Sequence, residues 1–437
     1  MNKVSGSCRV CFLIAMVLVN CSPLRTAAQG HSLPWTGTWA VSPVRDDSGR
    51  TFHKQTLRQI VHTSVAGRLA RIRFSNEFGS QAVTIADVHV AQRSTGSSIV
   101  AETDRQVRFD GVLSISIRPG LTAVSDPIAF SVPLLGDVTV SFYLPETTGP
   151  ATFHPFGFQT NYIADGDISG SAALAEATQT ESYYFLTNLD VQDQSTYGSI
   201  VAFGASITEG YASAPDSNRR WPNDLAEKLA KVGFDVGVLN QGISGNRLLS
   251  ADEGKSAEAR FDRDVLSQPG VHWVIFSDDP INDLGSTKPP PAADQLIAGI
   301  ERLIVRAHEK QIKLFCSTLT PYQGAGYWTE MGEIAREQIN AFIRGKTSGC
   351  DAVIDQDAAT HDPSQPSRFL PAYDSGDHLH PNEAGLQAIA NAVSLALFSQ
   401  PTGDCLNGGT PRPVPHRTKQ PGNDCPGSLR RMLRRVN

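Results

Sequence analysis

Four short segments of this chain hold side chains that together could cleave an ester. In chain order they carry a serine, a glycine, an asparagine and an Asp-x-x-His motif, at Ser206, Gly245, Asn282 and 377–380. A serine hydroxyl becomes an effective nucleophile when a histidine accepts its proton and a carboxylate orients that histidine. Backbone and amide N–H groups can stabilise the oxyanion that then forms. The set therefore indicates acyl transfer through a serine nucleophile.

The residues around the last motif leave more than one assignment open. Asp377 and His380 are three residues apart, so both side chains can reach one point from a loop or a turn. Asp374 and His378 lie beside them and compete for the same roles. Alternatively, the segment is a polar loop in which Asp377 caps the following helix, and Ser206 is an ordinary turn or cap residue.

The second half of the chain alternates between apolar strands and amphipathic helices. Strands are predicted at 200–203, 236–239, 271–276, 314–316 and 352–354, and helices at 221–229, 296–307, 334–343 and 383–398. This alternation favours a parallel sheet covered on both faces, in which ligands bind at the carboxyl ends of the strands. Ser206, Gly245 and Asn282 each follow a predicted strand, so we expect them to gather at that rim.

The first half has a different pattern. From about Trp35 to Val191, short apolar runs alternate with period two and are rich in β-branched residues, while long helical periodicity is absent. This pattern predicts half-buried antiparallel strands in a β-sandwich of jelly-roll type. A length of 437 residues also suits two domains. We therefore predict a β-sandwich domain over 33–192 and an α/β domain over 197–400.

The two ends of the chain differ from the middle. Lys3 and Arg9 precede an apolar run at 10–19 and a small-residue cleavage site, which predicts a signal peptide over 1–28. The protein is then expected to be secreted or periplasmic, with an N-terminal anchor as the alternative. No other segment approaches 18 apolar residues, so we expect no transmembrane segment in the mature chain. The basic stretch 401–437 is rich in Pro, Gly and Asn and predicts a flexible tail.

Net charge and cysteine spacing bear on which partners and metals this chain is expected to bind. The formal net charge of -6 disfavours a nucleic-acid partner. We expect Cys405 and Cys425 to pair within the tail, whereas Cys316 and Cys350 could pair or could both be buried thiols. The cysteine spacing does not resemble a zinc site, and no cofactor is expected.

The whole pattern resembles the SGNH (GDSL-type) hydrolase family over about residues 198–397. The segments that carry the resemblance surround the four candidate positions, at 200–210, 238–249, 273–285 and 377–385. The earlier segments 35–39 and 73–79 are similar to the N-terminal β domain of secreted two-domain members. The resemblance implies a three-layer α/β/α sandwich with a parallel sheet, and it requires no metal.

The resemblance also implies a role for each candidate residue. Ser206 is expected to be the nucleophile, with His380 as the base and Asp377 as the group that orients it. The backbone N–H groups of Ser206 and Gly245, together with the side chain of Asn282, are expected to form the oxyanion hole.

Two positions depart from the family pattern. Ala205 stands where the family has an aspartate that supports the nucleophile loop, and Pro280 stands where a glycine usually precedes the asparagine. Proline fixes φ and lacks an N–H, so Asn282 could be aimed differently. The stretch from Trp273 is also one residue longer. Neither change removes a group that makes or stabilises a bond.

The expected activity is that of an exported serine esterase. Short-chain or acetyl esters, on a small molecule or a polysaccharide, are the expected substrates. A lysophospholipase or thioesterase is one alternative, which would need an apolar groove for the acyl chain. A glycan-binding protein with weakened catalysis is another, motivated by Ala205 and Pro280.

Overall fold

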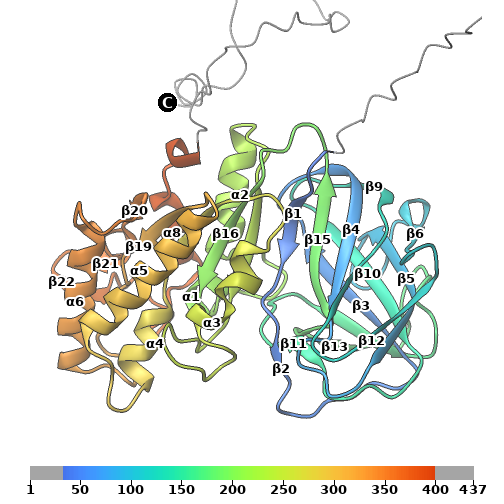
Figure 1. The fold of residues 1–437 in the computed structure, drawn as a ribbon, viewed down its shortest axis with the longest axis horizontal. Coiled ribbons are helices and arrows are strands. Elements are labelled where there is room, and N and C mark those ends of the chain that lie inside the picture. Colours follow the sequence, from blue (N-terminus) through green and yellow to red (C-terminus); the bar gives the residue numbers. More distant parts are fainter. Residues whose placement is uncertain (1–32, 399–437) are drawn as a thin grey trace, which may run out of the picture. The chain divides into compact units, whose positions relative to one another are not determined.

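The computed structural model describes residues 33–398, which contain an antiparallel β region followed by an α/β region (Figure 1). From Pro34 onward the described residues form one compact unit. The predicted signal peptide, the predicted tail and the predicted Cys405–Cys425 pair lie outside the described residues. Within 33–398, no helix is long and apolar enough to cross a membrane.

The β region consists of three antiparallel sheets. Its strands are β1 (Thr36–Ala40), β2 (Val44–Arg45), β3 (Gln55–His62), β4 (Gly67–Ser75), β5 (Val83–Gln92), β6 (Arg105–Gln106), β7 (Ser114–Ile117), β8 (Thr122–Val124), β9 (Ile128–Val132), β10 (Asp137–Leu144), β11 (Thr152–His154), β12 (Asn161–Asp165), β13 (Thr178–Thr180), β14 (Tyr183–Tyr184) and β15 (Leu186–Gln192). One sheet has the order β1-β15-β4-β8 with β9 beside β4, and a second has the order β13-β12-β3-β10-β5-β6 with β7 beside β5. The third sheet is β14-β11-β2.

Side chains of the two larger sheets share one apolar core. Phe74 on β4 and Phe142 on β10 are fully buried and pack edge to face, with ring centroids 4.9 Å apart. Along β9, buried Ile, Phe and Val alternate with exposed residues, as the period-two pattern requires. The predicted half-buried antiparallel strands are therefore confirmed, while their jelly-roll type of connection stays a prediction.

The α/β region is built on a five-stranded parallel sheet. Its strands are β16 (Ser199–Gly204), β17 (Gly237–Gly242), β18 (Val271–Phe276), β19 (Lys313–Ser317) and β20 (Ala352–Ile354), in the order β17-β16-β18-β19-β20. All six residues of β16 are buried, as expected for a strand covered on both faces. This confirms the predicted parallel sheet. A short hairpin, β21 (His361–Asp362) with β22 (Gln365–Phe369), lies outside it.

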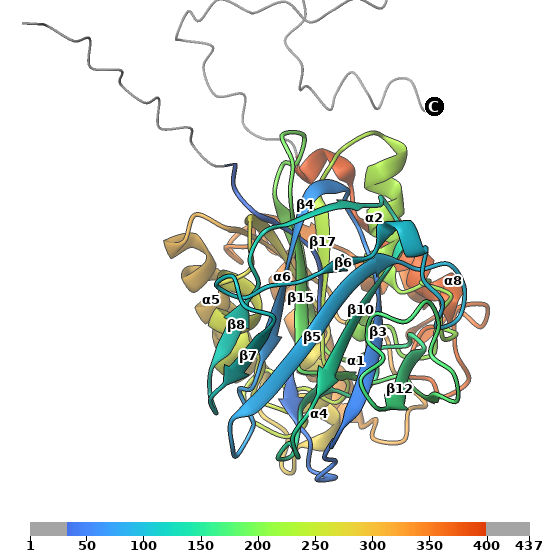
Figure 2. The same ribbon diagram turned by 90° about the vertical axis from the view of Figure 1, so that its right-hand side faces the viewer.

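Helices cover both faces of this sheet. They are α1 (Ser206–Glu209), α2 (Trp221–Lys231), α3 (Ala257–Phe261), α4 (Asp279–Ser286), α5 (Ala293–Glu309), α6 (Glu330–Arg344), α7 (Gln356–Thr360) and α8 (Glu383–Ala392), with a π-helical turn at Asp262–Leu266. Helix α2 lies in the crossover from β16 to β17, and α5 lies in the crossover from β18 to β19, which runs in the opposite direction across the sheet. Right-handed connections therefore place α2 and α5 on opposite faces. Helix α8 packs on α2, and α6 packs on α5. In Figure 2, α5 lies to the left of β17 and α8 to its right.

The helix predicted over 383–398 is shorter than expected. It ends at Ala392, because Val393 adopts an extended conformation. A short 3₁₀ helix, Leu395–Phe398, follows and brings the ring of Phe398 to 5.6 Å from that of Trp273. The last residues therefore pack on the sheet as a separate turn, which the apolar periodicity of the sequence did not predict.

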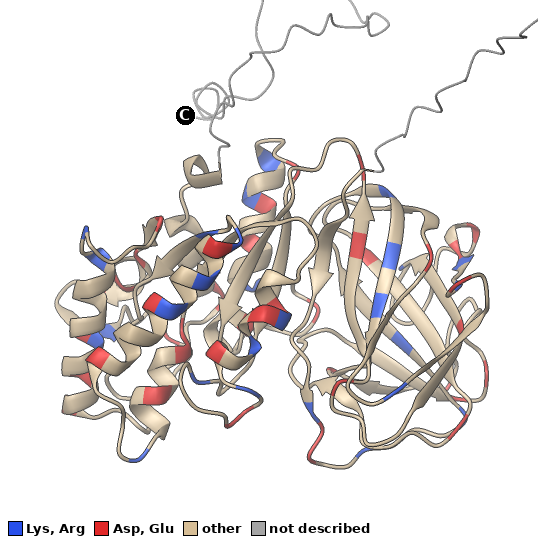
Figure 3. Ribbon diagram, in the orientation of Figure 1, with Lys and Arg blue, Asp and Glu red and all other residues tan. Residues whose placement is uncertain are grey.

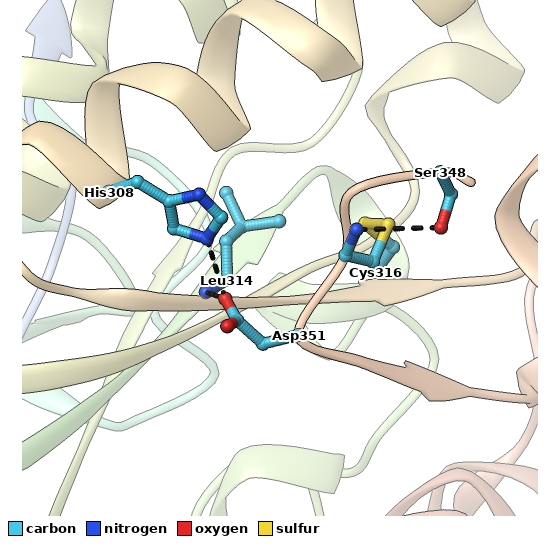
Figure 4. Close-up of a disulfide and its surroundings, with 6 residues drawn as sticks. His308, Leu314, Cys316, Ser348 and Asp351 are labelled. Atoms are coloured by element: carbon cyan, nitrogen blue, oxygen red, sulfur yellow. Dashed lines mark hydrogen bonds and ion pairs between the residues drawn. A yellow bond between two sulfur atoms is a disulfide. The ribbon is translucent and has the colours of Figure 1, made fainter. Parts of the chain in front are cut away.

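A disulfide joins Cys316 on β19 to Cys350, just before β20 (Figure 4). The two Cα atoms are 5.8 Å apart. Beside it, the carboxylate of Asp351 accepts a hydrogen bond from the backbone N–H of Leu314 and lies 2.8 Å from Nε2 of His308. Of the two alternatives that the sequence left open for these cysteines, the structure therefore has the disulfide.

Hydrogen bonds cross the seam between the β and α/β regions. The hydroxyl of Ser64 accepts from the backbone N–H of Val238 at 2.8 Å, and the hydroxyl of Ser42 donates to Gln241. The Asn188 amide donates to Gln268 at 2.8 Å. All three contacts involve buried side chains. The β region therefore supports the strand β17 that precedes the predicted glycine position.

Charged side chains of both signs are interspersed over the two regions (Figure 3). Arg71 on β4 pairs with Asp190 on β15 at 2.8 Å. On the α/β region, Arg306 of α5 pairs with Asp262 at 2.8 Å.

Candidate active site

Ser206 lies where strand β16 ends and helix α1 begins. It is the first residue of α1, and its side chain is largely buried. Because β16 is flanked by β17 and β18, the residues that follow these three strands meet at one rim of the sheet. Gly245 follows β17 and Asn282 follows β18, so the structure brings the three predicted positions to neighbouring strand ends.

His380 and Asp377 complete a continuous hydrogen-bonded chain with the serine. Nε2 of His380 lies 2.8 Å from Oγ of Ser206, and Nδ1 lies 2.6 Å from the Asp377 carboxylate. That carboxylate also accepts backbone N–H bonds from Leu379 and His380, both at 2.9 Å. With Asp377 ionised, Nδ1 of His380 carries the proton and Nε2 is free to accept the serine proton.

The electrostatics of Asp377 support that arrangement. Partial burial acts to raise the pKa of Asp377, but hydrogen bonds from the imidazole and the backbone N–H groups outweigh it. They hold the pKa of Asp377 well below its usual range. The group is therefore a carboxylate at neutral pH.

His378 forms a separate pair. Its Nδ1 lies 2.6 Å from the carboxylate of Asp374, and half of its side chain is exposed. The backbone of His378 is left-handed, with φ 62°, whereas the residues on either side of it are not in that region. Of the two histidines that the sequence offers, the structure thus places His380 against Ser206 and His378 away from it.

The predicted oxyanion donors have defined conformations. Gly245 has φ +76°, a conformation that favours glycine, and within the described residues its N–H bonds to no protein acceptor. The amide of Asn282 donates to the Asn246 carbonyl at 2.9 Å and accepts from the Tyr327 hydroxyl at 3.0 Å. These two bonds fix the plane of the Asn282 amide and leave its second N–H available. Since Ser206 starts α1, its own N–H has no acceptor within the helix.

Pro280 does not disturb this arrangement. It lies in the first turn of α4, where a helix needs no backbone N–H from it. Asn282 therefore projects from a regular helix, which the sequence reading did not predict. The neighbouring Asp283 accepts from the backbone N–H groups of Leu248 and Leu249, at 2.5 and 3.2 Å, and so ties α4 to the loop after β17.

Asp278 contacts the segment around Ser206, and the sequence analysis did not predict this contact. It accepts hydrogen bonds from the backbone N–H of Ala205 at 3.0 Å and of Ile207 at 2.8 Å. The hydroxyl of Thr208 donates to it at 2.6 Å. The signal that could have revealed it is an acidic residue two positions after a strand, in the longer stretch that also contains Pro280.

Glu209 is a second buried carboxylate that the sequence reading missed. It accepts from both the backbone N–H and the hydroxyl of Ser244, the residue before Gly245. Its other oxygen lies 3.2 Å from Nε2 of His154, a buried residue of the β region, although the two groups are not aligned as a hydrogen bond. Nδ1 of His154 lies 2.9 Å from the Ser42 carbonyl, to which it donates. A link thus runs from the β region through α1 to the loop of Gly245.

Burial is the largest cause of the pKa shifts of Glu209 and His154. It raises the pKa of Glu209 to about 8, against the hydrogen bonds from Ser244, and lowers the pKa of His154 to about 4. Two nearby charges have smaller and opposite effects: Asp278 raises the pKa of Glu209, and Arg260 lowers it. Near neutral pH, an uncharged Glu209 therefore faces an uncharged His154.

We expect the Glu209→Gln variant to gain stability relative to wild type as pH rises. The pKa of Glu209 is raised above its unfolded value of 4.5, so the folded state holds the extra proton and stability is lost as pH rises through about 8. At about 1.4 kcal/mol per pKa unit, the difference in unfolding free energy should grow by a few kcal/mol between pH 5 and 8.5. Urea denaturation at both pH values measures it. Parallel pH dependences for the two proteins would contradict the prediction.

Arg260 holds the strand ends together beneath the site. Its fully buried guanidinium donates to the carbonyls of Gly204 and Gln241, both at 2.8 Å, and to the Asn246 side chain at 2.9 Å. It also lies 4.1 Å from the ring centre of Phe203. The ends of β16 and β17 and the loop after β17 therefore share one buried cation. In residues 33–398, no group of three His, Cys, Asp or Glu side chains is placed to hold a metal ion.

Comparisons with known proteins match part of this chain to one family. Residues 202–388 match the GDSL-like Lipase/Acylhydrolase family. Similar solved structures include a lipase/acylhydrolase from Enterococcus faecalis, 20% identical over 44% of this chain and 92% of its own, with a TM-score of 0.35. A carbohydrate acetylesterase family member from Sinorhizobium meliloti and the aryl esterase of M. smegmatis are each 16% identical over 44% of this chain, cover 94% and 95% of their own, and have TM-scores of 0.36. No curated protein matches the chain.

Proposed function

Since the chain carries a GDSL-like lipase/acylhydrolase domain over 202–388 and is a hydrolase acting on ester bonds, we propose that it is an exported serine esterase that works through an acyl-enzyme. The hydrogen-bonded chain from Ser206 through His380 to Asp377 carries this proposal. The disulfide between Cys316 and Cys350 supports export, because such bonds persist in oxidising compartments.

In the first half of the reaction, Oγ of Ser206 attacks the ester carbonyl while Nε2 of His380 takes its proton. Asp377 stabilises the imidazolium that results. The N–H groups of Ser206 and Gly245 and the free amide N–H of Asn282 receive the oxyanion. When the tetrahedral intermediate collapses, His380 returns the proton to the alcohol oxygen, the alcohol leaves, and the acyl group remains on Ser206.

In the second half, water takes the place of the alcohol. Nε2 of His380 removes a proton from the water as the water oxygen attacks the acyl carbonyl. The same donors stabilise the second oxyanion. Its collapse breaks the bond to Oγ of Ser206, which regains its proton from His380, and the carboxylic acid is released.

An open recess of about 1070 Å³ beside Asp377 supports an ester of a carbohydrate as the substrate. Tyr211 lines it, with its ring centroid 4.3 Å from that of His380. Phe158 and Glu181 line it from the β region. Aromatic faces beside polar groups suit a sugar ring, whereas a long acyl chain needs an enclosed apolar groove. We therefore favour acetyl or other short acyl groups over lysophospholipids and long thioesters.

The supports around Ser206 also favour catalysis over glycan binding alone. Asp278 supplies the nucleophile segment with a carboxylate, and Pro280 leaves Asn282 on a regular helix. The two departures that motivated a weakened enzyme are thus accommodated.

Covalent labelling tests the proposed chemistry. Wild-type protein should react with a fluorophosphonate probe at Ser206 and should hydrolyse p-nitrophenyl acetate. Purified, folded protein that does neither would sink the esterase proposal. A panel of acetylated glycans against long-chain lysolipids then tests the substrate class, and faster turnover of the lysolipids would reverse that choice.

We expect Asn282→Ala to lower kcat about 10²-fold to 10³-fold with little change in KM, because one oxyanion donor is lost. Tyr327→Phe should have a smaller effect, since it removes only the bond that orients the Asn282 amide. Steady-state kinetics on p-nitrophenyl acetate measures both variants. Equal losses in the two would indicate that orientation rather than donation is the role of Asn282.

A further inference from the structure

The helix that begins with the nucleophile lacks a cap of its own. Ala205 occupies the N-cap position of α1, with φ −106° and ψ −137°, and its methyl group can accept no hydrogen bond. N-cap side chains normally accept the backbone N–H of the second or third helical residue, here Ile207 or Thr208. A group from elsewhere must supply this acceptor if the turn that holds Ser206 is to stay fixed.

Asp278 supplies it from the neighbouring strand end. Asp278 is itself the N-cap residue of α4, yet its side chain makes no capping bond to that helix. Instead, one oxygen accepts from Ile207 N–H at 2.8 Å, and the other accepts from Ala205 N–H at 3.0 Å and Thr208 Oγ1 at 2.6 Å. The side chain is 3% exposed, so water does not compete for these bonds.

The surroundings are shaped for this contact. A Cβ at Gly204 would lie 2.4 Å from Oδ1 of Asp278. Only glycine at position 204 therefore leaves room for the carboxylate. The Asp278 carbonyl also accepts from Ile281 N–H at 3.1 Å, and the preceding Ser277 N–H donates to the Phe203 carbonyl at 2.9 Å. The backbone on either side of Asp278 is thereby held against β16 and α4.

We propose that Asp278 is a positioning residue that caps the nucleophile helix from the next strand and so aims Oγ of Ser206 at His380. This role rests on the serine esterase chemistry proposed above. The bonded amides belong to the residues immediately before and after Ser206, so they fix the backbone of the nucleophile on both sides. The same contact explains the two sequence departures together, since the carboxylate absent at Ala205 is delivered by the longer stretch that contains Pro280.

A carboxylate swap tests the proposal. We expect Asp278→Ala to lower kcat and the rate of fluorophosphonate labelling 10-fold to 100-fold, with KM changed less than threefold. Thr208→Val, which removes one of the three donors, should cost less. The double variant Ala205→Asp with Asp278→Ala should recover at least tenfold over Asp278→Ala, because an aspartate at the N-cap accepts from Ile207 directly. Ala205→Asp alone should be slower than wild type, since two buried carboxylates then compete for the same donors.

Wild-type kcat in the Asp278→Ala variant, or a double variant no faster than it, would overturn the proposal while leaving the esterase function intact. A measurement that does not depend on turnover is also needed, in case the wild-type protein is inactive or a variant folds poorly. Amide hydrogen exchange at Ile207 should speed up in Thr208→Val and Asp278→Ala and slow again in the double variant. Unchanged exchange at Ile207 in all variants would equally overturn the proposal.

Discussion

Replacing Ser206 with alanine is expected to abolish fluorophosphonate labelling and to lower kcat/KM for p-nitrophenyl acetate by about 10⁴-fold to 10⁶-fold. The change removes the only hydroxyl that contacts Nε2 of His380 among the described residues. Without it no acyl-enzyme can form, and the remaining rate reflects the oxyanion donors acting on water. Labelling followed by peptide mass spectrometry, together with steady-state kinetics, measures the loss.

Ser195→Ala is the matched control for that variant. Among residues 33–398, the exposed hydroxyl of Ser195 contacts only Asp193, so this variant should label and turn over like wild type. Retention of more than a tenth of the wild-type rate by Ser206→Ala, with folding verified by circular dichroism, would mean that another residue is the nucleophile.

His380→Ala should be the second severe variant, again with a loss of about 10⁴-fold or more in kcat. His380 is the only described side chain that can take the Ser206 proton, and its other ring nitrogen is held by Asp377. The loss should be largest near neutral pH and smaller at high pH, where hydroxide can replace the missing base.

The chain provides a close control in His378→Ala. His378 also bonds an aspartate, at four residues' spacing, but it faces Asp374 and solvent rather than Ser206. We expect kcat within threefold of wild type and a modest loss of thermal stability. If His378→Ala were the inactive variant and His380→Ala the active one, the base would be wrongly assigned.

The order of the site along the chain could be predicted from sequence because it depends on local patterns. Short apolar strands predict the sheet, and parallel strand ends predict a common rim for Ser206, Gly245 and Asn282. The Asp-x-x-His spacing predicts that one turn can hold an acid and a histidine. None of these inferences needs knowledge of how distant side chains pack.

Composition and spacing alone could not choose between His378 and His380, and only the family resemblance favoured His380. Both have an aspartate within four residues on the N-terminal side, so composition and spacing treat them alike. What separates them is the left-handed backbone at His378, which directs one ring to Asp374 and leaves the other over Ser206. Conformations of this kind depend on the whole loop.

The contacts of the buried carboxylates Asp278 and Glu209 could not be predicted from the sequence, for a similar reason. Asp278 acts on residues about seventy positions earlier, and Glu209 meets His154 across the boundary between the regions. Such pairs follow from which strands become neighbours and how closely their ends approach. A reading that proceeds segment by segment sees only an unusual Ala205 and an unusual Pro280.

The seam between the regions has a consequence for how the protein can be divided and recombined. A cut near residue 195 would remove the hydroxyls of Ser64 and Ser42, which bond the N–H of Val238 and the guanidinium of Arg260. It would also remove the imidazole of His154, which lies beside the Glu209 carboxyl group. In a chimera, each of these polar groups that is buried again without a hydrogen-bond partner costs about 1–3 kcal/mol, a large share of the stability of a typical domain. The intact protein should therefore melt in a single calorimetric transition, and a chimera that exchanges the β region should be more stable when it keeps Ser42 and Ser64 than when it lacks them.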